Sequence, residues 1–170
     1  MNNTLTLDVG CGHKPKGDVN IDLFTRSTGH RCDDQTKNTD VPLSAREIKN
    51  LINAECCHLP FADNTFDAAM SNSLIEHIDE PFMLLKELVR VTKNEGRVKI
   101  ICPHKLSHRR EYIFHKHSFN VSWFTKAFAI LNIKVTQINI AWRYIPHRYL
   151  PWIRLPSHFQ IIGVINKKKN

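Results

Sequence analysis

The sequence lacks long apolar runs: there is no stretch of eighteen apolar residues and no apolar N-terminal segment with a basic flank. A transmembrane helix needs about 20 mostly apolar residues, and a secretory signal needs the flanked apolar core. The cysteines do not suggest a disulfide framework, because there are five of them, an odd number, and no two have a CxxC spacing. That pattern fits reduced thiols better than disulfides or a zinc site. We therefore expect a cytoplasmic protein without a transmembrane segment.

Glycine is scarce, with only 6 residues in 170, yet two of them interrupt one short turn, Gly10-Cys11-Gly12. A dinucleotide fingerprint would place a third glycine in this turn and an acid about twenty residues later. Here the third glycine is missing, Pro15 follows, and the acid, Asp22, comes after about half that distance. The sequence therefore disfavours binding of NAD.

The turn nevertheless has the features of a nucleotide site. It follows an apolar strand expected over residues 5–9, and glycines there allow positive φ and a close approach of a ligand to the main chain. A second expected strand, residues 19–22, ends in Asp22. A carboxylate at a neighbouring strand tip can accept hydrogen bonds from both hydroxyls of a ribose.

The formal net charge is +8, and most of the excess lies after Lys99. A basic half favours an anionic partner, such as nucleic acid, a phosphorylated substrate or a membrane surface. A solvated basic face with a basic tail explains the same composition, so both interpretations stand. The oligomeric state cannot be inferred from this sequence.

Strands alternate with helices along the chain, which predicts a single α/β domain over residues 1–170 with a disordered basic tail at 166–170. Further strands are expected at 52–56, 66–71, 97–102, 133–140 and 159–165. Pro81 begins a helix closed by Asn94 and Gly96, another helix is capped near Ser122, and Ser44 with Glu47 forms a capping box. The sheet should be mostly parallel, with ligands at the carboxyl ends of its strands.

Several segments in this order resemble the class I S-adenosylmethionine-dependent methyltransferases, particularly the small type 11 branch. The resemblance covers about residues 5–103. It rests on the segments Leu7–Gly12, Leu59-Pro60-Phe61, Ser71–Ile78 with its Glu-His pair, and Lys93–Arg97. The family's glycine turn lies beneath the methionine and ribose of the cofactor, and Asp22 matches its ribose-binding acid.

The resemblance implies a Rossmann-like methyltransferase domain of about seven strands with an antiparallel last strand. It implies S-adenosyl-L-methionine as cofactor and S-adenosyl-L-homocysteine as product. The expected cofactor-binding residues are Asp8, Gly10, Cys11, Gly12, Asp22, Leu23, Glu55, Cys56, Asn72 and His77. Glu55 stands where the family usually has aspartate near the adenine.

One departure concerns the first crossover, because only about ten residues separate Gly10 from Asn20. A parallel crossover normally needs a dozen or more residues, usually including a helix. The first helix must therefore be truncated or absent.

Methyl transfer from a sulfonium needs mainly alignment, and a general base helps only for a hydroxyl or protonated amine. His77 and His104 follow the fourth and fifth strands and are the candidate catalytic residues, although closing the cofactor pocket explains His77 better than catalysis does. Arg109, Arg110 and His115 are the candidate substrate-binding residues. The set His104, His108, His115 and His117 with Glu111 could hold a metal, but we expect none.

Three functions remain open at this point. The first is transfer of a methyl group to an oxygen or nitrogen of a small molecule, or of a glycan or lipid-linked precursor. The second is methylation of RNA or protein, favoured by the basic half. The third is a non-catalytic module that keeps the cofactor site, which the short first crossover favours.

Overall fold

The structure is a computed structural model that describes residues 4–12, 14–23, 49–107, 115–144 and 154–167. Seven strands and two helices are found in these ranges. They are β1 (Thr6–Val9), β2 (Val19–Asp22), β3 (Leu51–Asn53), β4 (Phe66–Asn72), α1 (Pro81–Val91), β5 (Thr92–Pro103), α2 (Val121–Ile130), β6 (Ile133–Tyr144) and β7 (Arg154–Ile165).

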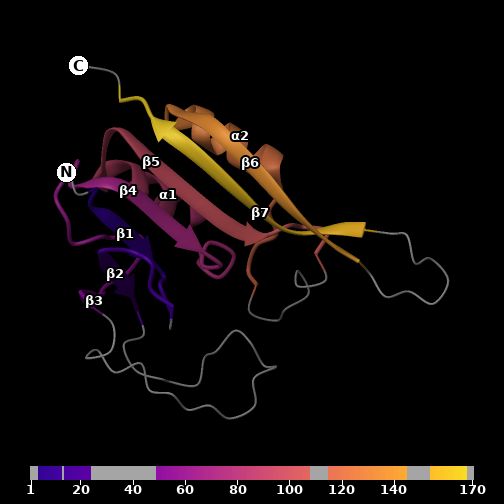
Figure 1. Cartoon of the computed structure of the whole chain (residues 1–170), viewed down its shortest axis with the longest axis horizontal. Coiled ribbons are helices and arrows are strands. Elements are labelled where there is room, and N and C mark those ends of the chain that lie inside the picture. Colours follow the sequence, from indigo (N-terminus) through magenta and orange to yellow (C-terminus); the bar gives the residue numbers. More distant parts are fainter. Residues whose placement is uncertain (1–3, 13, 24–48, 108–114, 145–153, 168–170) are drawn as a thin grey trace, which may run out of the picture.

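The strands form one sheet in the order β3-β2-β1-β4-β5-β7-β6 (Figure 1). Strands β1 to β5 pair in parallel, and β7 runs antiparallel between β5 and β6. This confirms the expected class I methyltransferase fold with its antiparallel last strand. The parallel strands all end at one edge, which we call the carboxyl edge.

One face of the sheet carries the apolar core. In register across β1, β4 and β5, the row Leu7, Ala69 and Val98 is buried, whereas the next row on the other face includes the half-buried Met70 and Lys99. Helix α1 contacts β4 and β5, and α2 contacts β6 and β7. Their fully buried side chains join the same core cluster, namely Leu84, Leu85, Leu88, Val91, Phe124 and Phe128. Burying this face is the main source of stability in the described part.

The end of α1 corrects one sequence prediction. The helix ends at Val91 rather than at Asn94 and Gly96, and β5 begins at the next residue. The Thr92 hydroxyl donates to the carbonyl of Leu88 at 2.6 Å, which satisfies one of the last helical acceptors. Asn94 to Gly96 form an irregularity inside β5, where Glu95 adopts φ 61° and the β4–β5 register shifts.

Helix α2 is capped two residues earlier than expected. The side chain of Asn120, not Ser122, accepts from the backbone N–H of Trp123 at 2.9 Å. The last two strands are longer than predicted and extend to Tyr144 and back to Arg154. The capping box at Ser44 and Glu47 lies outside the described residues.

The first crossover contains no helix in its described residues, 10–12 and 14–18, as its shortness predicted. The chain turns instead by hydrogen bonds. Gly10 N and Cys11 N both donate to the carbonyl of Ile21, at 2.8 and 3.0 Å. These bonds hold the glycine turn against β2 without a helix behind it.

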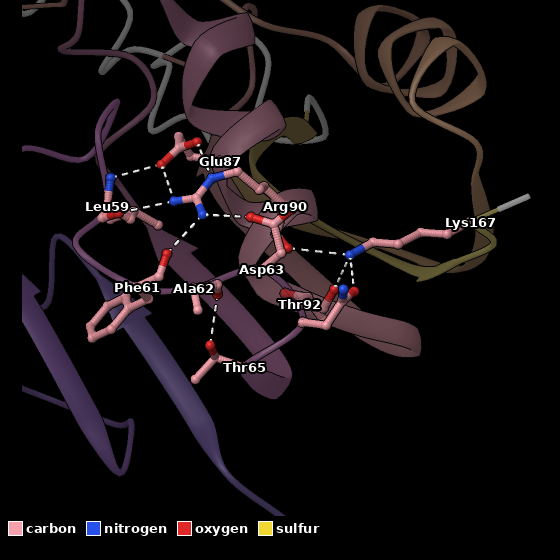
Figure 2. Close-up of polar contacts among 10 residues, drawn as sticks. Leu59, Phe61, Ala62, Asp63, Thr65, Glu87, Arg90, Thr92 and Lys167 are labelled. Carbon is pink, nitrogen blue, oxygen red and sulfur yellow. Dashed lines mark hydrogen bonds and ion pairs between the residues drawn. The ribbon is translucent and has the colours of Figure 1, made fainter. Parts of the chain in front are cut away.

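The loop after β3 is fastened to α1 by Arg90 (Figure 2). The guanidinium donates to the carbonyls of Leu59 and Phe61 at 2.9 and 2.7 Å, and it pairs with Asp63 at 2.8 Å. Glu87 completes the arrangement, accepting from Arg90 Nε and from Leu59 N, each at 2.7 Å. The bond from Arg90 lowers the pKa of Glu87, so both groups are charged at neutral pH.

The segment after β7 is fixed as far as Lys167. Asn166 N donates to the carbonyl of Asn132 at 3.0 Å, and the Lys167 ammonium donates to the carbonyl of Thr92 at 2.7 Å (Figure 2). These two residues of the predicted tail are therefore hydrogen-bonded, and 168–170 lie outside the described residues. No helix in the described ranges is both long and apolar enough to cross a membrane.

Candidate active site at the carboxyl edge

The predicted cofactor residues come from four different segments of the chain. All of these segments follow the carboxyl ends of parallel strands. Gly10 to Gly12 follow β1, Asp22 and Leu23 end β2, Glu55 and Cys56 follow β3, and Asn72 ends β4. Ligands of open α/β sheets bind at this edge. The topology therefore brings the sequence-predicted residues to one place.

The glycine turn requires glycine at two positions. Gly10 has φ 72° and Gly12 has φ 53°, both in the left-handed region that side chains disfavour. A Cβ on Gly10 would lie 2.8 Å from Leu74 Cδ2, whereas a Cβ on Gly12 would meet nothing within 4 Å. Gly10 thus permits the β4–α1 loop to close on the turn, and Gly12 faces open space.

Two carboxylates hold this turn through its backbone. Asp22 Oδ2 accepts from Gly12 N at 2.8 Å, and the buried Asp8 accepts from Lys16 N at 2.9 Å through Oδ2. Desolvation by burial raises the pKa of Asp8. Because a carboxylate offers about four acceptor positions, the bond to Gly12 does not exhaust Asp22 as an acceptor for a ribose.

The residues predicted to contact the adenine follow β3, whose end is hydrogen-bonded to the end of β2. The Asn53 amide donates to the carbonyl of Leu23 at 2.6 Å, and Ala54 N donates to that of Asp22 at 3.4 Å. Glu55 follows directly and is exposed, pairing with His58 Nδ1 at 3.1 Å. Leu23, whose carbonyl accepts from Asn53, has an apolar side chain that is 55% exposed. An exposed acid suits the polar edge of an adenine, and an exposed leucine suits its flat face.

The two cysteines predicted at the site are unreactive. Burial raises the pKa of Cys11 to about 12, with the nearby carboxylates of Asp22 and Asp8 adding to the shift. Burial likewise raises the pKa of Cys56 to about 12, helped by its neighbour Cys57. A thiol of this pKa carries almost no thiolate at neutral pH, so both side chains act through shape and not as nucleophiles.

On the β4 side, the chain turns sharply after the half-buried Asn72. Ser73 has φ 54°, and the following loop packs Leu74 against Gly10. His77 N donates to the carbonyl of Leu74 at 2.9 Å, which places His77 one turn beyond it. Asn72 and His77 thus lie at the two ends of the segment that contains Leu74, and their contact with the cofactor stays a prediction.

Sequence reasoning did not give Glu76 a role of its own, although it stands in the segment Leu74-Ile75-Glu76-His77-Ile78. Its side chain is 2% exposed, and neither carboxylate oxygen accepts a hydrogen bond from the described part of the chain. Desolvation raises the pKa of Glu76 to about 7. The signal available in the sequence was a carboxylate placed inside an apolar run.

The ring of His115 lies against that of His77, with centroids 4.7 Å apart. This contact brings a predicted substrate-binding residue to a predicted cofactor-binding one. Lys116 N and His117 N donate to the carbonyl of Glu76, at 2.8 and 3.2 Å. The segment after residue 114 is thereby fixed beside the β4–α1 loop.

His104 follows β5 at the same edge, and its main chain pairs with that of Phe119. Its Nδ1 accepts the backbone N–H of Leu106 at 3.2 Å, so the ring hydrogen is on Nε2. Desolvation lowers the pKa of His104, and Lys105 lowers it further. His104 is therefore a neutral imidazole whose Nε2–H is a hydrogen-bond donor.

The two predicted substrate arginines, Arg109 and Arg110, lie outside the described residues, as do His108 and Glu111 of the metal set considered from the sequence. The structure does not bring His104 or His117 into a ligand cluster with His115. Among the described residues, one group has metal-ligand spacing, and its members are Glu76, His77 and His115.

We predict that Asp22→Asn weakens cofactor binding about ten- to hundredfold, because a hydrogen bond to a charged group contributes roughly 1.5–3 kcal/mol. Asparagine can still accept from Gly12 N, so the turn should persist. Calorimetric titration with S-adenosylhomocysteine measures the effect. The matched control is Asp18→Asn, whose carboxylate accepts from Thr6 at the opposite edge. Equal affinity of Asp22→Asn and wild type would mean that the ribose lies elsewhere.

The described residues fit S-adenosylmethionine. The open space over Gly12 admits a ligand against bare main chain, and Asp22 stands beside it as an acceptor. A cationic sulfonium beside the carboxylates of Asp8 and Asp22 is electrostatically favourable.

Comparison with known sequences supports this reading. The chain is 31% identical over 136 residues to an uncharacterized protein of Methanocaldococcus jannaschii, covering 79% of this chain and 57% of that one. It is 31% identical over 96 residues to a demethylmenaquinone methyltransferase of Paenarthrobacter aurescens, covering 56% of this chain and 36% of that one. The chain thus spans about half or less of the length of these relatives.

Solved structures share the fold at low sequence identity. A SAM-dependent methyltransferase from Methanosarcina mazei superposes with a TM-score of 0.67 at 15% identity, over 99% of this chain and 95% of that one. Another, from Archaeoglobus fulgidus, gives a TM-score of 0.64 at 16% identity, over 94% and 85%. The family model described as "Methyltransferase domain" matches residues 7–100, which include the glycine turn, Asp22 and the Glu-His pair. This match and the observed fold show that the chain belongs to the methyltransferase domain family, whose cofactor is S-adenosylmethionine.

Proposed function

We propose that the protein is an S-adenosylmethionine-dependent methyltransferase acting in the cytoplasm on an oxygen or nitrogen of an anionic small molecule, or of a glycan or lipid-linked precursor. The observation that carries the cofactor half of this proposal is the open glycine turn fastened to Asp22. The part of the proposal that concerns the methyl acceptor rests on the residues that follow β4 and β5.

When bound, the cofactor supplies an electrophilic methyl group on a sulfonium. The protein's task is to hold the acceptor atom in line with it and to exclude water. Leu74 against Gly10 closes the β4–α1 loop on the turn, and Ile75 behind it is buried. Apolar packing of this kind excludes water from the place where the methyl group is transferred, and this favours a transition state in which the positive charge is dispersed.

The two candidate catalytic histidines, His77 and His104, follow β4 and β5 at the carboxyl edge. Of the two candidate catalytic residues, His104 presents an N–H, which suits holding an acceptor oxygen rather than deprotonating it. His77 is the residue that could take a proton from a hydroxyl or ammonium acceptor. An acceptor that is already nucleophilic would need no base.

Basic side chains favour an anionic acceptor. Lys105 follows β5 at the carboxyl edge, whereas the ammonium of Lys116 is paired with Asp79. Arg109 and Arg110 belong to the same stretch of sequence between them. The relative named as a demethylmenaquinone methyltransferase gives no acceptor for this chain, because the match covers 36% of that protein.

The test is release of S-adenosylhomocysteine when the protein is given S-adenosylmethionine and one acceptor class at a time. We expect turnover with anionic small molecules or precursors. Turnover with RNA only, with affinity falling steeply as salt rises, would replace the proposal by RNA methylation. Cofactor binding without turnover on any acceptor, protein included, would favour a binding module.

We predict that Arg109→Ala with Arg110→Ala raises KM for the acceptor at least about tenfold, with cofactor affinity nearly unchanged, as expected for a lost substrate contact. The charge-matched control is Lys126→Ala with Lys134→Ala, because both lysines are exposed and Lys134 begins β6 at the opposite edge. A collapse of cofactor affinity in the arginine variant, with turnover falling only in proportion, would assign these arginines to the cofactor site instead.

A further inference from the structure

The β4–α1 loop buries a carboxylate that the proposed methyl transfer does not use. Glu76 is 2% exposed, and within the described ranges neither of its oxygens receives a hydrogen bond. Burying an ionised carboxylate in this way costs free energy unless a proton or a cation compensates it. The local structure does not move Glu76 outward, because its carbonyl is held by Lys116 N and His117 N.

Two imidazoles converge on this carboxylate. His77 Nε2 lies 4.0 Å from Glu76 Oε1, and the ring of His115 contacts that of His77 with centroids 4.7 Å apart. One ligand atom from each of the three residues lies within 4.8 Å of the other two. The three side chains come from two segments that the backbone bonds of Glu76 fasten together.

Lys116, whose backbone N–H binds the Glu76 carbonyl, does not neutralise the carboxylate. Lys116 directs its ammonium to Asp79 Oδ1 at 2.6 Å, and both groups are largely exposed. His117 turns the same way, with Nε2 3.2 Å from the carbonyl of Asp79. The charge of the segment is thus directed away from Glu76, toward solvent.

We propose that Glu76, His77 and His115 bind a divalent transition-metal ion. Two imidazoles and one carboxylate are common ligands of zinc and other first-row transition metals, with metal–ligand bonds of about 2.0–2.2 Å. Donor atoms around a tetrahedral ion are then about 3.4 Å apart, so the three side chains must approach by roughly an ångström. Side-chain rotation supplies this, and the ion satisfies both the carboxylate and the rings.

The inference goes beyond the proposed function and does not depend on it. Three protein ligands leave a position open for water or for an oxygen atom of a bound molecule. His77 cannot be both a metal ligand and a general base, so an occupied site removes that role from His77.

The experiment is titration of the purified, metal-stripped protein with Zn²⁺ by calorimetry, and with Co²⁺ by visible absorption. We expect one equivalent of either ion to bind. Glu76→Gln and His115→Gln should each weaken Zn²⁺ binding at least about tenfold, since each removes one of three ligands. His117→Gln is the matched control, because it changes a histidine of the same segment whose ring faces Asp79.

His115 is half-exposed and close to the surface, so His115→Gln tests the site even if Glu76→Gln does not fold. The proposal is wrong if Zn²⁺ does not bind stoichiometrically, or if folded His115→Gln binds as tightly as His117→Gln. It is equally wrong if the Co²⁺ complex shows thiolate charge transfer that Cys56→Ser with Cys57→Ser removes. None of these readouts requires methyl transfer, so failure of the metal site and failure of the proposed activity are distinguishable.

Discussion

Gly12→Ala should weaken binding of S-adenosylhomocysteine about ten- to hundredfold while leaving the unliganded protein folded, because overfilling a close contact costs roughly 1–3 kcal/mol. The added Cβ meets nothing within 4 Å in the unliganded protein, so it fills only the space that the cofactor requires. Titration calorimetry gives the affinity, and thermal unfolding gives the stability. A modest stability loss is expected from φ 53° alone.

Gly10→Ala is the contrasting variant. Its Cβ would lie 2.8 Å from Leu74 Cδ2, so this change should lower the stability of the unliganded protein as well as the affinity. The two glycines are thereby separated: one serves packing of the β4–α1 loop, the other serves the ligand. Wild-type affinity in Gly12→Ala would show that the ligand does not lie against the turn.

Arg90→Ala should be the most destabilising single change we predict, by about 2–4 kcal/mol, because it removes charged hydrogen bonds to two carbonyls and leaves Glu87 without its partner. For a chain of this size that corresponds to a fall in Tm on the order of 10 °C. Glu87 is only 14% exposed, which makes its isolation costly. Chemical denaturation measures the free energy of unfolding.

Lys93→Ala is the control for Arg90→Ala. Lys93 also pairs with an aspartate at 2.8 Å, Asp67, but both side chains are more than a third exposed. Such a pair contributes about 0–1 kcal/mol. Equal effects of the two substitutions would mean that the bonds to Leu59 and Phe61 do not stabilise the loop. Arg90→Lys should be intermediate, since lysine keeps the charge but cannot span both carbonyls.

The sequence predicts those features of this protein that depend on local chemistry. Alternating strands and helices, Pro81 at the start of α1 and the glycines after β1 each express a backbone preference, and the structure agrees with them. The prediction that Asn94 and Gly96 end the helix is wrong, because both residues lie in the irregular first part of β5. The helix ends earlier because the Thr92 hydroxyl donates to the Leu88 carbonyl while the Thr92 backbone already pairs with Phe66 of β4.

The features that could not be predicted depend on contacts between distant segments. Nothing local to Arg90 indicates that it binds carbonyls some thirty residues earlier. Glu76 and His115 are separated by about forty residues, and the contacts of Lys116 and His117 with Glu76 and Asp79 bring them together. Resemblance to a family gives the order of the strands, and it cannot give these side-chain contacts.

The central claim is that the carboxyl edge of β1, β2 and β4 holds the methyl donor. A crystal structure of the protein with S-adenosylhomocysteine tests it most directly. We expect the ribose hydroxyls on the Asp22 carboxylate, the homocysteine chain over Gly10 to Gly12, and the adenine beside Leu23 and Glu55. Density for the ligand at any other place, with the space over Gly12 empty, would contradict the account.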